Sequence, residues 1–450
     1  MFRKMLVANR GEIAVRVLRA CKELGIRTVA VFSEADRDSR AVQLADEAVC
    51  VGPAAGSKSY LNVPNILSAA HITGADAVHP GYGFLAENSY FVEACEQMGL
   101  AFIGPPAATM ERLADKVRAR EELAKAGVRV IPGSKGALRS LAEAERTAGQ
   151  LHFPVMLKAA AGGGGRGLRI VRRADELARA FPIAQSEAVA AFGDGELYLE
   201  SYLEQVRHVE IQVLVDRHGQ AVHLGERDCS VQRRRQKLIE ESPSPALTAD
   251  LRSKMGGLAA RAAAAIGYVN AGTLEFLVDG AGKFYFMEIN TRIQVEHPVT
   301  EMAYGIDLVK LQIAVAAGEK LPFRQSDLRA QGHAIECRVN AEDPDHAFTP
   351  QSGTISEFVP PGGNGVRVDT HLSAGCRVTP FYDSLLAKVI THGRDRTEAI
   401  ARMRSALEEF AITGVKTTIP FHLRVLSDPV FKDGRADTSY VERLGLDEAA

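Results

Sequence analysis

A polar or charged residue occupies every second position from 288 to 296, and the positions between them are mostly apolar. The polar positions in this segment are Glu288, Asn290, Arg292, Gln294 and Glu296. Because successive side chains of an extended chain point to opposite faces, the pattern predicts a strand with all these polar groups on one side. A solvated outer strand would also alternate, but the preceding segment at 284–287 is too apolar for a surface edge. We therefore favour a site for a metal ion and an anion, since clustered charges are rare without a role.

A hairpin is predicted immediately before this segment. Two strand-like runs at 272–278 and 283–288 flank an Asp-Gly-Ala-Gly turn. With a symmetric loop, Phe286 lies opposite Glu275, and Glu288 is the diagonal neighbour of Glu275 on the same face. Diagonal positions are roughly 7–8 Å apart, so both carboxylates could reach one Mg²⁺ ion. A one-residue bulge would reverse the parity of the second strand, and that alternative stays open.

A glycine-rich tract follows Lys158, between apolar strand-like segments at 154–157 and 168–171. Glycines let the backbone approach an anion closely and turn its N–H groups toward it. The tract fits neither a Walker A pattern nor a Rossmann fingerprint. A flexible linker is the alternative, but the strands on both sides favour a loop that covers phosphate groups. We expect this loop to belong to a mobile lid at 132–203.

Strands and helices alternate along residues 1–113, which predicts a doubly wound α/β domain. A helix is expected at 12–24. The expected strands lie at 5–8, 28–32, 47–51, 75–78 and 101–103. Such sheets bind ligands at the loops that follow their strands, here 9–11 and 79–84. His79 is expected to satisfy a local hydrogen bond rather than to bind a metal.

Two further domains are predicted after residue 113. Residues 114–330 combine the lid with a strand-rich region, whose clearest strand lies at 208–214. Residues 331–446 begin with a strand at 334–339 and end in a helix near 396–410. The last domain is therefore expected to be a strand-rich α+β domain.

The composition is that of an ordinary enzyme, with 450 residues of which 46% are hydrophobic and 24% charged. A formal net charge of −2 argues against a nucleic-acid binder, and the basic run at 233–235 lies among acidic residues, which favours an anion site. The N-terminus lacks the apolar core of a signal peptide, and no apolar run approaches the ~20 residues needed to span a bilayer. Since the cysteines are scattered, we expect a cytoplasmic protein with reduced thiols, in which Cys229 is an ordinary thiol.

Motifs at 8–14, 79–85, 288–301 and 336–338 point to one enzyme family. Together, and in this order, they closely resemble biotin carboxylase, the ATP-grasp subunit or domain of biotin-dependent carboxylases such as acetyl-CoA carboxylase. The resemblance covers nearly the whole chain. It implies an ATP-grasp fold and an ATP-dependent ligase that carboxylates biotin with bicarbonate, through carboxyphosphate. It also implies Mg²⁺ as the metal ion, with Mn²⁺ as an alternative.

The resemblance further implies the partners of the chain. Biotin would be a substrate attached to a separate biotin carboxyl carrier protein, because no Ala-Met-Lys-Met-like segment occurs here and the C-terminus leaves no room for a biotin-accepting domain. Carboxyltransferase subunits would complete an acyl-CoA carboxylation, the step that feeds fatty acid biosynthesis. A homodimer is implied, with neither a nucleic-acid nor a membrane partner.

The matching motif positions carry the family's site residues onto this sequence. Nucleotide contacts are implied at Lys116, Lys158, Gly164, Gly165, Glu200, Ser201, Leu203, His208 and Arg235. Metal ligands are implied at Glu275, Glu288 and Asn290. Bicarbonate contacts are implied at Lys237, Arg292, Gln294, Val295 and Glu296, with Glu296 as the base. Biotin contacts are implied at Tyr82 and Arg338, and the catalytic groups would be Lys237, Arg292, Glu296 and Arg338.

Some positions depart from the family pattern. Ser201 and Arg235 stand where Lys and His are frequent near the nucleotide, and Ala161 replaces the first glycine of a longer tract. Another ATP-grasp ligase, forming carbamoyl phosphate or joining a carboxylate to an amine, would share the nucleotide and metal residues but would not require Tyr82 and Arg338. A biotin carboxylase subunit of a pyruvate carboxylase is a second alternative. A catalytically silent scaffold is a third, and the presence of the metal and bicarbonate residues argues against it.

Overall fold

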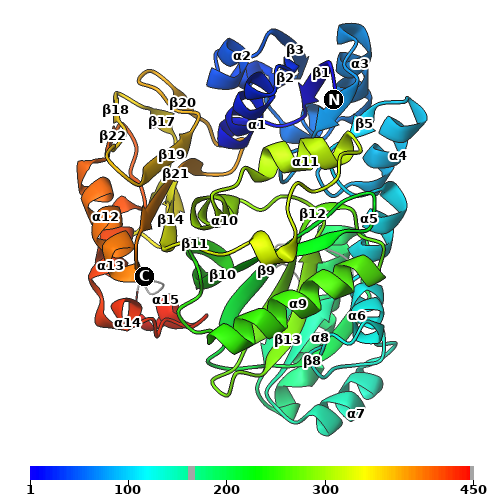
Figure 1. Cartoon of the computed structure of the whole chain (residues 1–450). Coiled ribbons are helices and arrows are strands. Elements are labelled where there is room, and N and C mark those ends of the chain that lie inside the picture. Colours follow the sequence, from blue (N-terminus) through cyan, green and yellow to red (C-terminus); the bar gives the residue numbers. More distant parts are fainter. Residues whose placement is uncertain (161–167, 446–450) are drawn as a thin grey trace.

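The N-terminal part of the molecule is a parallel five-stranded sheet in the order β3-β2-β1-β4-β5, at the top of Figure 1. The computed structural model describes residues 1–160 and 168–445. The strands are β1 Lys4–Val7, β2 Arg27–Ser33, β3 Glu47–Gly52, β4 Ala77–His79 and β5 Ala101–Phe102. The helices between them are α1 Gly11–Glu23, α2 Arg40–Leu44, α3 Val63–Thr73 and α4 Ser89–Gln97. Because β1 is central, the chain winds outward in both directions, which confirms the doubly wound prediction.

The loops after β1 and β4 meet at the carboxyl edge of this sheet. Asn9 is buried, and its Nδ2 donates hydrogen bonds to the carbonyl oxygens of Pro80 at 2.6 Å and Tyr82 at 2.7 Å. His79 Nδ1 accepts a hydrogen bond from the Gly81 N–H at 3.0 Å, as expected for a locally satisfied histidine. These bonds hold the two predicted ligand-binding loops side by side.

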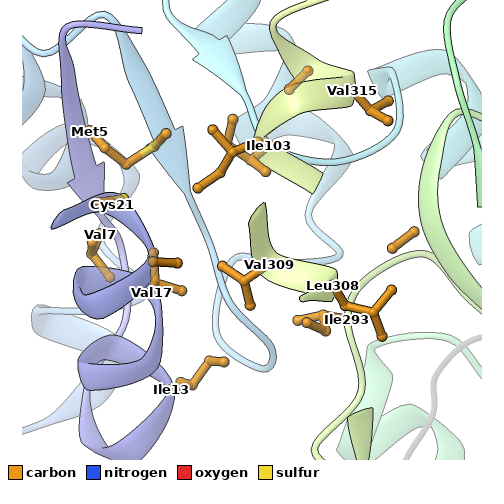
Figure 2. Close-up of a cluster of buried hydrophobic side chains, with 14 of the residues drawn as sticks. Met5, Val7, Ile13, Val17, Cys21, Ile103, Ile293, Leu308, Val309 and Val315 are labelled. Atoms are coloured by element: carbon orange, nitrogen blue, oxygen red, sulfur yellow. The ribbon is translucent and has the colours of Figure 1, made fainter. Parts of the chain in front are cut away.

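Apolar side chains of β1 and α1 pack against a helix from much later in the chain, α11 Leu308–Ala316 (Figure 2). Ile13 and Val17 of α1 belong to the same buried cluster as Val309 of α11. Ile293 also belongs to it and is fully buried. Since Ile293 is an apolar position of the alternating segment, this core anchors the polar residues on either side of it.

A small antiparallel sheet, in the order β7-β6-β8, forms the region that was predicted to be a lid, at the bottom of Figure 1. Its strands are β6 Val155–Ala159, β7 Leu168–Val171 and β8 Leu197–Ser201. The helices before and around it are α5 Ala107–Ala114, α6 Lys116–Lys125, α7 Leu141–Leu151 and α8 Ala174–Phe192. The pairing of β6 with β7 confirms a hairpin around the glycine tract, whose residues 161–167 lie outside the described part of the chain.

The centre of the molecule is an eight-stranded antiparallel sheet in the order β13-β12-β9-β10-β11-β14-β21-β19. Its strands are β9 Arg207–Val215, β10 Ala221–Arg233, β11 Gln236–Ser242, β12 Asn270–Val278, β13 Phe284–Asn290, β14 His333–Asn340, β19 Val366–Thr370 and β21 Leu385–Gly393. The pairing of β11 with β14 makes the strands after residue 330 continuous with the earlier ones. Side chains of the predicted last domain can therefore enter the same site.

Helices and short strands complete the central and C-terminal parts. The helices are α9 Ala249–Ala265, α10 His297–Tyr304, α12 Arg396–Glu409, α13 Ile419–Ser427, α14 Pro429–Lys432 and α15 Tyr440–Arg443. The strands are β15 Glu342–Asp343, β16 Thr349–Pro350, β17 Gly353–Thr354, β18 Glu357–Val359, β20 Arg377–Val378 and β22 Ala411–Thr413. Within the described ranges, no helix combines the length and apolar character needed to cross a membrane.

Two expectations about the polar segment were wrong. The register at the turn pairs Phe286 with Phe276 rather than with Glu275, and a bulge at Met287 then places Glu288 directly opposite Glu275. The strand also ends at Asn290 instead of continuing to residue 296. It ends there because the next residue, Thr291, donates its N–H to the carboxylate of Glu87 at 3.1 Å.

Candidate active site

A large open cleft lies among the N-terminal loops, the lid and the central sheet, and its volume is about 1610 Å³. Its wall contains every predicted site residue that the structure describes: Tyr82, Lys116, Lys158, Glu200, Ser201, Leu203, His208, Arg235, Lys237, Glu275, Glu288, Asn290, Arg292, Gln294, Val295, Glu296 and Arg338. Gly164 and Gly165 lie outside the described residues. The predicted nucleotide, metal, bicarbonate and biotin residues thus surround one cavity, while the role of each stays a prediction.

Charged residues form a row across neighbouring strands, in which Glu288 and Glu275 line the cleft while Glu210 and Arg227 are fully buried. Glu288 of β13 pairs with Glu275 of β12, Glu275 pairs with Glu210 of β9, and Glu210 pairs with Arg227 of β10. Directly paired residues point to the same face of a sheet, so the side chains are neighbours. Adjacent carboxylates repel one another, and a buried row of this kind needs cations between its members.

Lys237 of β11 supplies one such cation. Its Nζ lies 2.6 Å from Glu210, 2.6 Å from Glu296 and 3.1 Å from Glu275. Burial favours the neutral amine, but the surrounding carboxylates outweigh burial and hold the pKa of Lys237 well above its usual range. The ammonium therefore stays charged at the centre of the site.

Glu296, at the N-terminus of α10, lies between two cations. Lys237 contacts one carboxylate oxygen, and Nη2 of Arg338 lies 2.8 Å from the other. Burial would raise the pKa of Glu296, but Lys237 and then Arg338 overcome burial and hold it well below the usual range. Arg338 is itself shared, because Glu240 lies 2.5 Å from its guanidinium. Burial raises the pKa of Glu240 to about 7 in spite of this contact.

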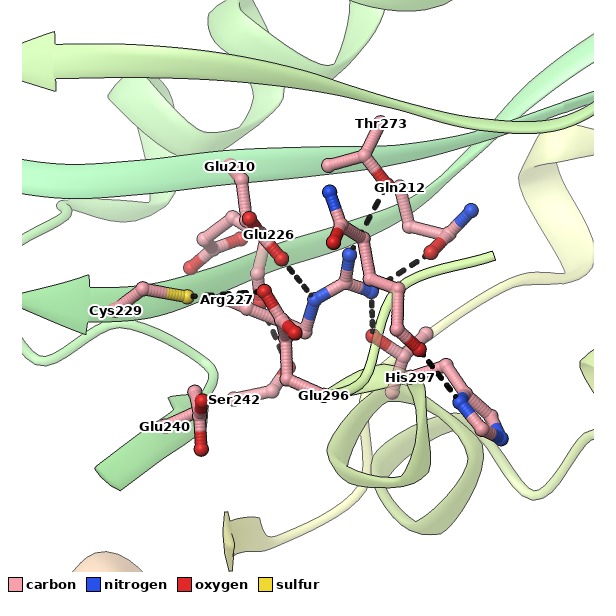
Figure 3. A network of polar contacts seen from close by, with 12 residues as sticks. Glu210, Gln212, Glu226, Arg227, Cys229, Glu240, Ser242, Thr273, Glu296 and His297 are labelled. Carbon is pink, nitrogen blue, oxygen red and sulfur yellow. Dashed lines mark hydrogen bonds and ion pairs between the residues drawn. The ribbon is translucent and has the colours of Figure 1, made fainter. Parts of the chain in front are cut away.

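Sequence reasoning missed Glu210 and Arg227, which hold the floor of the site together (Figure 3). Arg227 is fully buried, and its Nε donates a hydrogen bond to Glu210 at 2.5 Å. Its terminal nitrogens donate to side-chain oxygens at 2.8–3.2 Å, namely those of Gln212, Thr300 and Thr273. Cys229 is buried with its Sγ 3.9 Å from Glu296, and burial raises the pKa of this thiol well above normal. A protonated thiol there agrees with an ordinary, non-nucleophilic cysteine.

The predicted metal ligands line one corner of the cleft. Glu275 accepts a hydrogen bond from Asn290 Nδ2 at 2.7 Å and contacts His208 Nε2 at 2.8 Å. Burial raises the pKa of Glu275, but Lys237 and His208 reverse this effect and lower it. Ligand atoms of His208, Glu210 and Glu275 all lie within 4.8 Å of one another. Of these residues His208 and Glu275 line the cleft, while Glu210 is fully buried. The carboxylate oxygens of Glu275 and Glu288 at the cleft are of the kind that a hard divalent cation such as Mg²⁺ prefers.

The predicted nucleotide residues come from the lid and from α6. Lys116, at the start of α6, lies 3.2 Å from Glu288, and this carboxylate helps to raise the pKa of the lysine in spite of burial. Lys158 of β6 and Arg120 of α6 both pair with Glu200 of β8. The Arg120–Glu200 pair ties this small sheet to α6, and the ammonium groups of Lys116 and Lys158 both line the cleft. The sequence did not predict the role of Arg120 as a partner of Glu200.

The predicted biotin and bicarbonate side chains are held from the N-terminal domain. The Tyr82 hydroxyl donates a hydrogen bond to Glu12 of α1, and burial raises the pKa of the phenol well above normal. Gly81 has a φ of 61°, and a Cβ there would lie 2.9 Å from Ile13 Cγ1, so this loop requires a glycine. Arg292 lies 3.0 Å from Glu87 and donates a hydrogen bond to Gln294 Oε1 at 3.0 Å.

Comparison with known families divides the chain into consecutive matches. Residues 1–110 match the family described as Biotin carboxylase, N-terminal domain, and residues 336–443 match the Biotin carboxylase C-terminal domain. Residues 115–324 match the Carbamoyl-phosphate synthase L chain, ATP binding domain. Biotin carboxylase 1 of Bacillus subtilis (strain 168) is 55% identical over 443 residues, which is 98% of each chain. The chain belongs to the biotin carboxylase family.

Solved biotin carboxylase structures share the whole fold. The Campylobacter jejuni biotin carboxylase in a β-γ-ATP complex is 48% identical, with a TM-score of 0.97 over 98% of this chain and 99% of that one. The biotin carboxylase domain dimer of the Hydrogenobacter thermophilus 2-oxoglutarate carboxylase, solved with MgADP, ADP and bicarbonate, is 52% identical. Its TM-score is 0.96 over 100% of this chain and 99% of that one. These likenesses confirm the ATP-grasp fold and the assignment to ATP-dependent ligases.

Proposed function

We propose that the chain catalyses the ATP-dependent carboxylation of biotin with bicarbonate. The observation that carries this proposal is Glu296, which is held between Lys237 and Arg338 in a cleft that also contains Tyr82. Glu296 would be the base, Lys237 and Arg338 the two cations, and Tyr82 a contact for the biotin ring. This combination suits the activation of a small anion beside a ureido ring. Related structures solved with MgADP and bicarbonate support the choice of substrates.

In the first step, Glu296 removes the proton of bicarbonate while a bicarbonate oxygen attacks the γ-phosphorus of ATP. The bond from that phosphorus to ADP breaks, and carboxyphosphate forms. The low pKa of Glu296 would make it a weak base in isolation. The cations that lower its pKa also acidify the bicarbonate, so the proton can still move. Lys237, Arg292, Gln294 and Val295 complete the bicarbonate site in this proposal.

In the second step, carboxyphosphate releases CO₂ beside the phosphate that remains. The phosphate takes the N–H proton of biotin, and the nitrogen forms a bond to CO₂. Arg338 stabilises the negative charge that develops on the ureido oxygen, since a fixed cation is most effective in a site shielded from water. Tyr82 holds the ring. Biotin arrives on a separate carrier protein.

The remaining assignments place the nucleotide between the lid and the central sheet. Lys116, Lys158 and His208, together with Glu200, Ser201, Leu203, Arg235 and the tract with Gly164 and Gly165, contact ATP. Glu275, Glu288 and Asn290 hold Mg²⁺, which supplies positive charge that stabilises phosphoryl transfer. We assign the domains to 1–113, 114–330 and 331–446, with 132–203 as a mobile lid.

The biological setting in this proposal is a cytoplasmic homodimer that works with a carrier protein and carboxyltransferase subunits. The acceptor is an acyl-CoA, as in the pathway to fatty acids. A keto acid is the second candidate, because a 52% identical neighbour is the biotin carboxylase domain of a 2-oxoglutarate carboxylase.

The test is ADP release with MgATP and bicarbonate, in the presence and absence of free biotin. We expect turnover that requires bicarbonate and rises with biotin, and loss of both dependences in Glu296→Gln with nucleotide binding retained. Glu319→Gln, at an exposed position, is the matched control. A rate of ADP release that is unchanged by biotin but increases with ammonia or an amine would overturn the proposal in favour of another ATP-grasp ligase.

A further inference from the structure

Lys388 is a buried charged residue behind the wall of the cleft. It lies on β21, paired with Arg338 of β14 on one side and with Asp369 of β19 on the other. Its side chain is fully buried. A lysine in such a position must have partners, because an isolated buried ammonium is strongly disfavoured.

The ammonium of Lys388 contacts two other parts of the molecule. Its Nζ donates a hydrogen bond to the Val295 carbonyl at 2.9 Å and lies 3.0 Å from Glu12 of α1. Burial favours the neutral amine, yet Glu12, Glu336 and Asp369 raise the pKa of Lys388 above its usual value. One side chain from the C-terminal region thus joins the polar loop after β13 to the first helix of the N-terminal domain.

Glu12 continues this connection into the cleft. Its Oε1 is the atom that Lys388 contacts, and the same oxygen accepts the hydrogen bond of the Tyr82 hydroxyl. The Lys388 ammonium also lies 5.8 Å from the centre of the Tyr82 ring. Tyr82 and Val295 both line the cleft, while Lys388 supports them from behind.

We propose that Lys388 is a positioning residue that sets the Tyr82 side of the site relative to the loop that carries Val295, and that carboxyl transfer to biotin depends on it. This inference rests on the proposed function. Apart from Val295, whose carbonyl Lys388 contacts, the side chains assigned to bicarbonate have anchors of their own: Glu87 for Arg292, Glu275 for Gln294, and Lys237 for Glu296. The Tyr82 hydroxyl is anchored through Glu12, which Lys388 neutralises. Loss of Lys388 should therefore damage the biotin step more than bicarbonate activation.

The experiment measures Lys388→Met in ADP-release assays with bicarbonate alone and with increasing free biotin. We expect kcat/KM for biotin to fall by roughly 10- to 100-fold, because a displacement of about 1 Å at a reacting group can cost that much. The biotin-independent rate should change much less and stay within about threefold of the wild type. Lys416→Met is the matched control, since Lys416 pairs with Asp343 at 2.6 Å on an exposed part of the same C-terminal region.

A second pair of variants tests the connection if Lys388→Met does not fold. Tyr82→Phe removes the hydroxyl that contacts Glu12, and Glu12→Gln removes the charge that binds Lys388. If the residues act in series, Glu12→Gln should raise the KM for biotin in the wild type but have little further effect in Tyr82→Phe. If the double variant instead raises the KM for biotin by the product of the two single effects, the residues act independently and the inference is overturned.

The outcomes also separate this inference from the proposed function. If biotin does not change the ATP turnover of the wild-type enzyme, both the proposed function and the inference about Lys388 are overturned. A biotin-dependent wild type with an unchanged KM for biotin in Lys388→Met would overturn only the role of Lys388. Equal losses in both assays, together with a lower melting temperature, would make Lys388 a structural residue and would also overturn the inference.

Discussion

The substitution Lys237→Met removes one ammonium from the centre of the site while keeping a side chain of similar length. In the wild type this Nζ lies 2.6 Å from Glu210, 2.6 Å from Glu296 and 3.1 Å from Glu275, and only 12% of the side chain is exposed. The variant leaves these buried carboxylates with fewer cations than the wild type has. Either the site rearranges or some of the carboxylates take up protons.

The size of the effect on stability follows from this burial. Removal of one partner from a buried ion pair costs about 3–5 kcal/mol, so we expect the free energy of unfolding at pH 7 to fall by about that amount. The pKa of Glu296 lies below its ordinary value, so Glu296 contributes stability above the unfolded pKa, and this contribution is lost as the pH falls through the folded pKa. Without Lys237 the folded pKa of Glu296 rises. Acid unfolding of the variant should therefore begin at a higher pH.

The effect on activity can be measured in the same preparation. Removal of one donor that stabilises charge in a transition state costs about 10²–10³-fold in rate, and we expect a loss of that order in bicarbonate-dependent ADP release. Urea unfolding at several pH values gives the stability, and Lys416→Met serves as the exposed control. A rate within threefold of the wild type, together with an unchanged free energy of unfolding, would refute the role of Lys237 as the central cation.

Four further predictions follow from the same geometry. Arg338→Ala should lower biotin carboxylation by about 10²–10³-fold and bicarbonate-dependent ATP cleavage much less, and equal losses would contradict its role at biotin. Glu288→Gln should raise the Mg²⁺ concentration for half-maximal turnover by roughly tenfold or more, since even the partners of metal ligands change affinity by that much; an unchanged Mg²⁺ dependence would exclude Glu288 as a ligand. Burial raises the pKa of Glu240 to about 7, above its unfolded value near 4.3, so the stability that Glu240 contributes is lost as the pH rises. Urea unfolding at pH 5 and pH 8 should show the free energy of unfolding falling more in the wild type than in Glu240→Gln, and equal pH slopes would contradict this. Amide exchange at 155–160 should slow when a non-hydrolysable ATP analogue saturates the protein, whereas unchanged exchange would indicate a preformed loop.

The alternating segment shows how far local sequence determines this site. The pattern correctly predicted that Glu288, Asn290, Arg292, Gln294 and Glu296 gather in one place, because all of them line the cleft. It predicted the wrong backbone, since the strand ends at Asn290. The interaction that ends it comes from Glu87, about 200 positions earlier in the chain, where the carboxylate accepts the Thr291 N–H. A contact of that separation leaves no trace in a local pattern.

The prediction of the hairpin register was wrong for a similar reason. Loop length alone gave a register in which Glu275 and Glu288 were diagonal neighbours. The bulge at Met287 makes them direct neighbours instead. A bulge adds one residue to one strand and depends on packing at the sheet edge, which a single sequence does not reveal. The prediction that both carboxylates share a face survives because the register error and the bulge together shift the pairing by two residues.

Glu210 could have been found with the rule that found Glu288. His208, Glu210 and Gln212 alternate with Val209 and Ile211 in a strand that was itself predicted. Arg227 offered no such signal, because it lies in the run Glu226-Arg227-Asp228, which has the composition of a solvated turn. Only the pairing of β10 with β9 shows that Arg227 is fully buried beside Glu210.

The arrangement of charge links the stability of the sheet to the chemistry of the site. Glu288, Glu275 and Glu210 are direct neighbours across three strands, an order that would be destabilising without counter-charges. Arg227 and Lys237 provide those charges from the next two strands of the sheet, and Lys237 also contacts Glu296. The ammonium that would acidify bicarbonate is therefore the same group that allows these carboxylates to coexist. Substitutions at this position cannot change one property without changing the other.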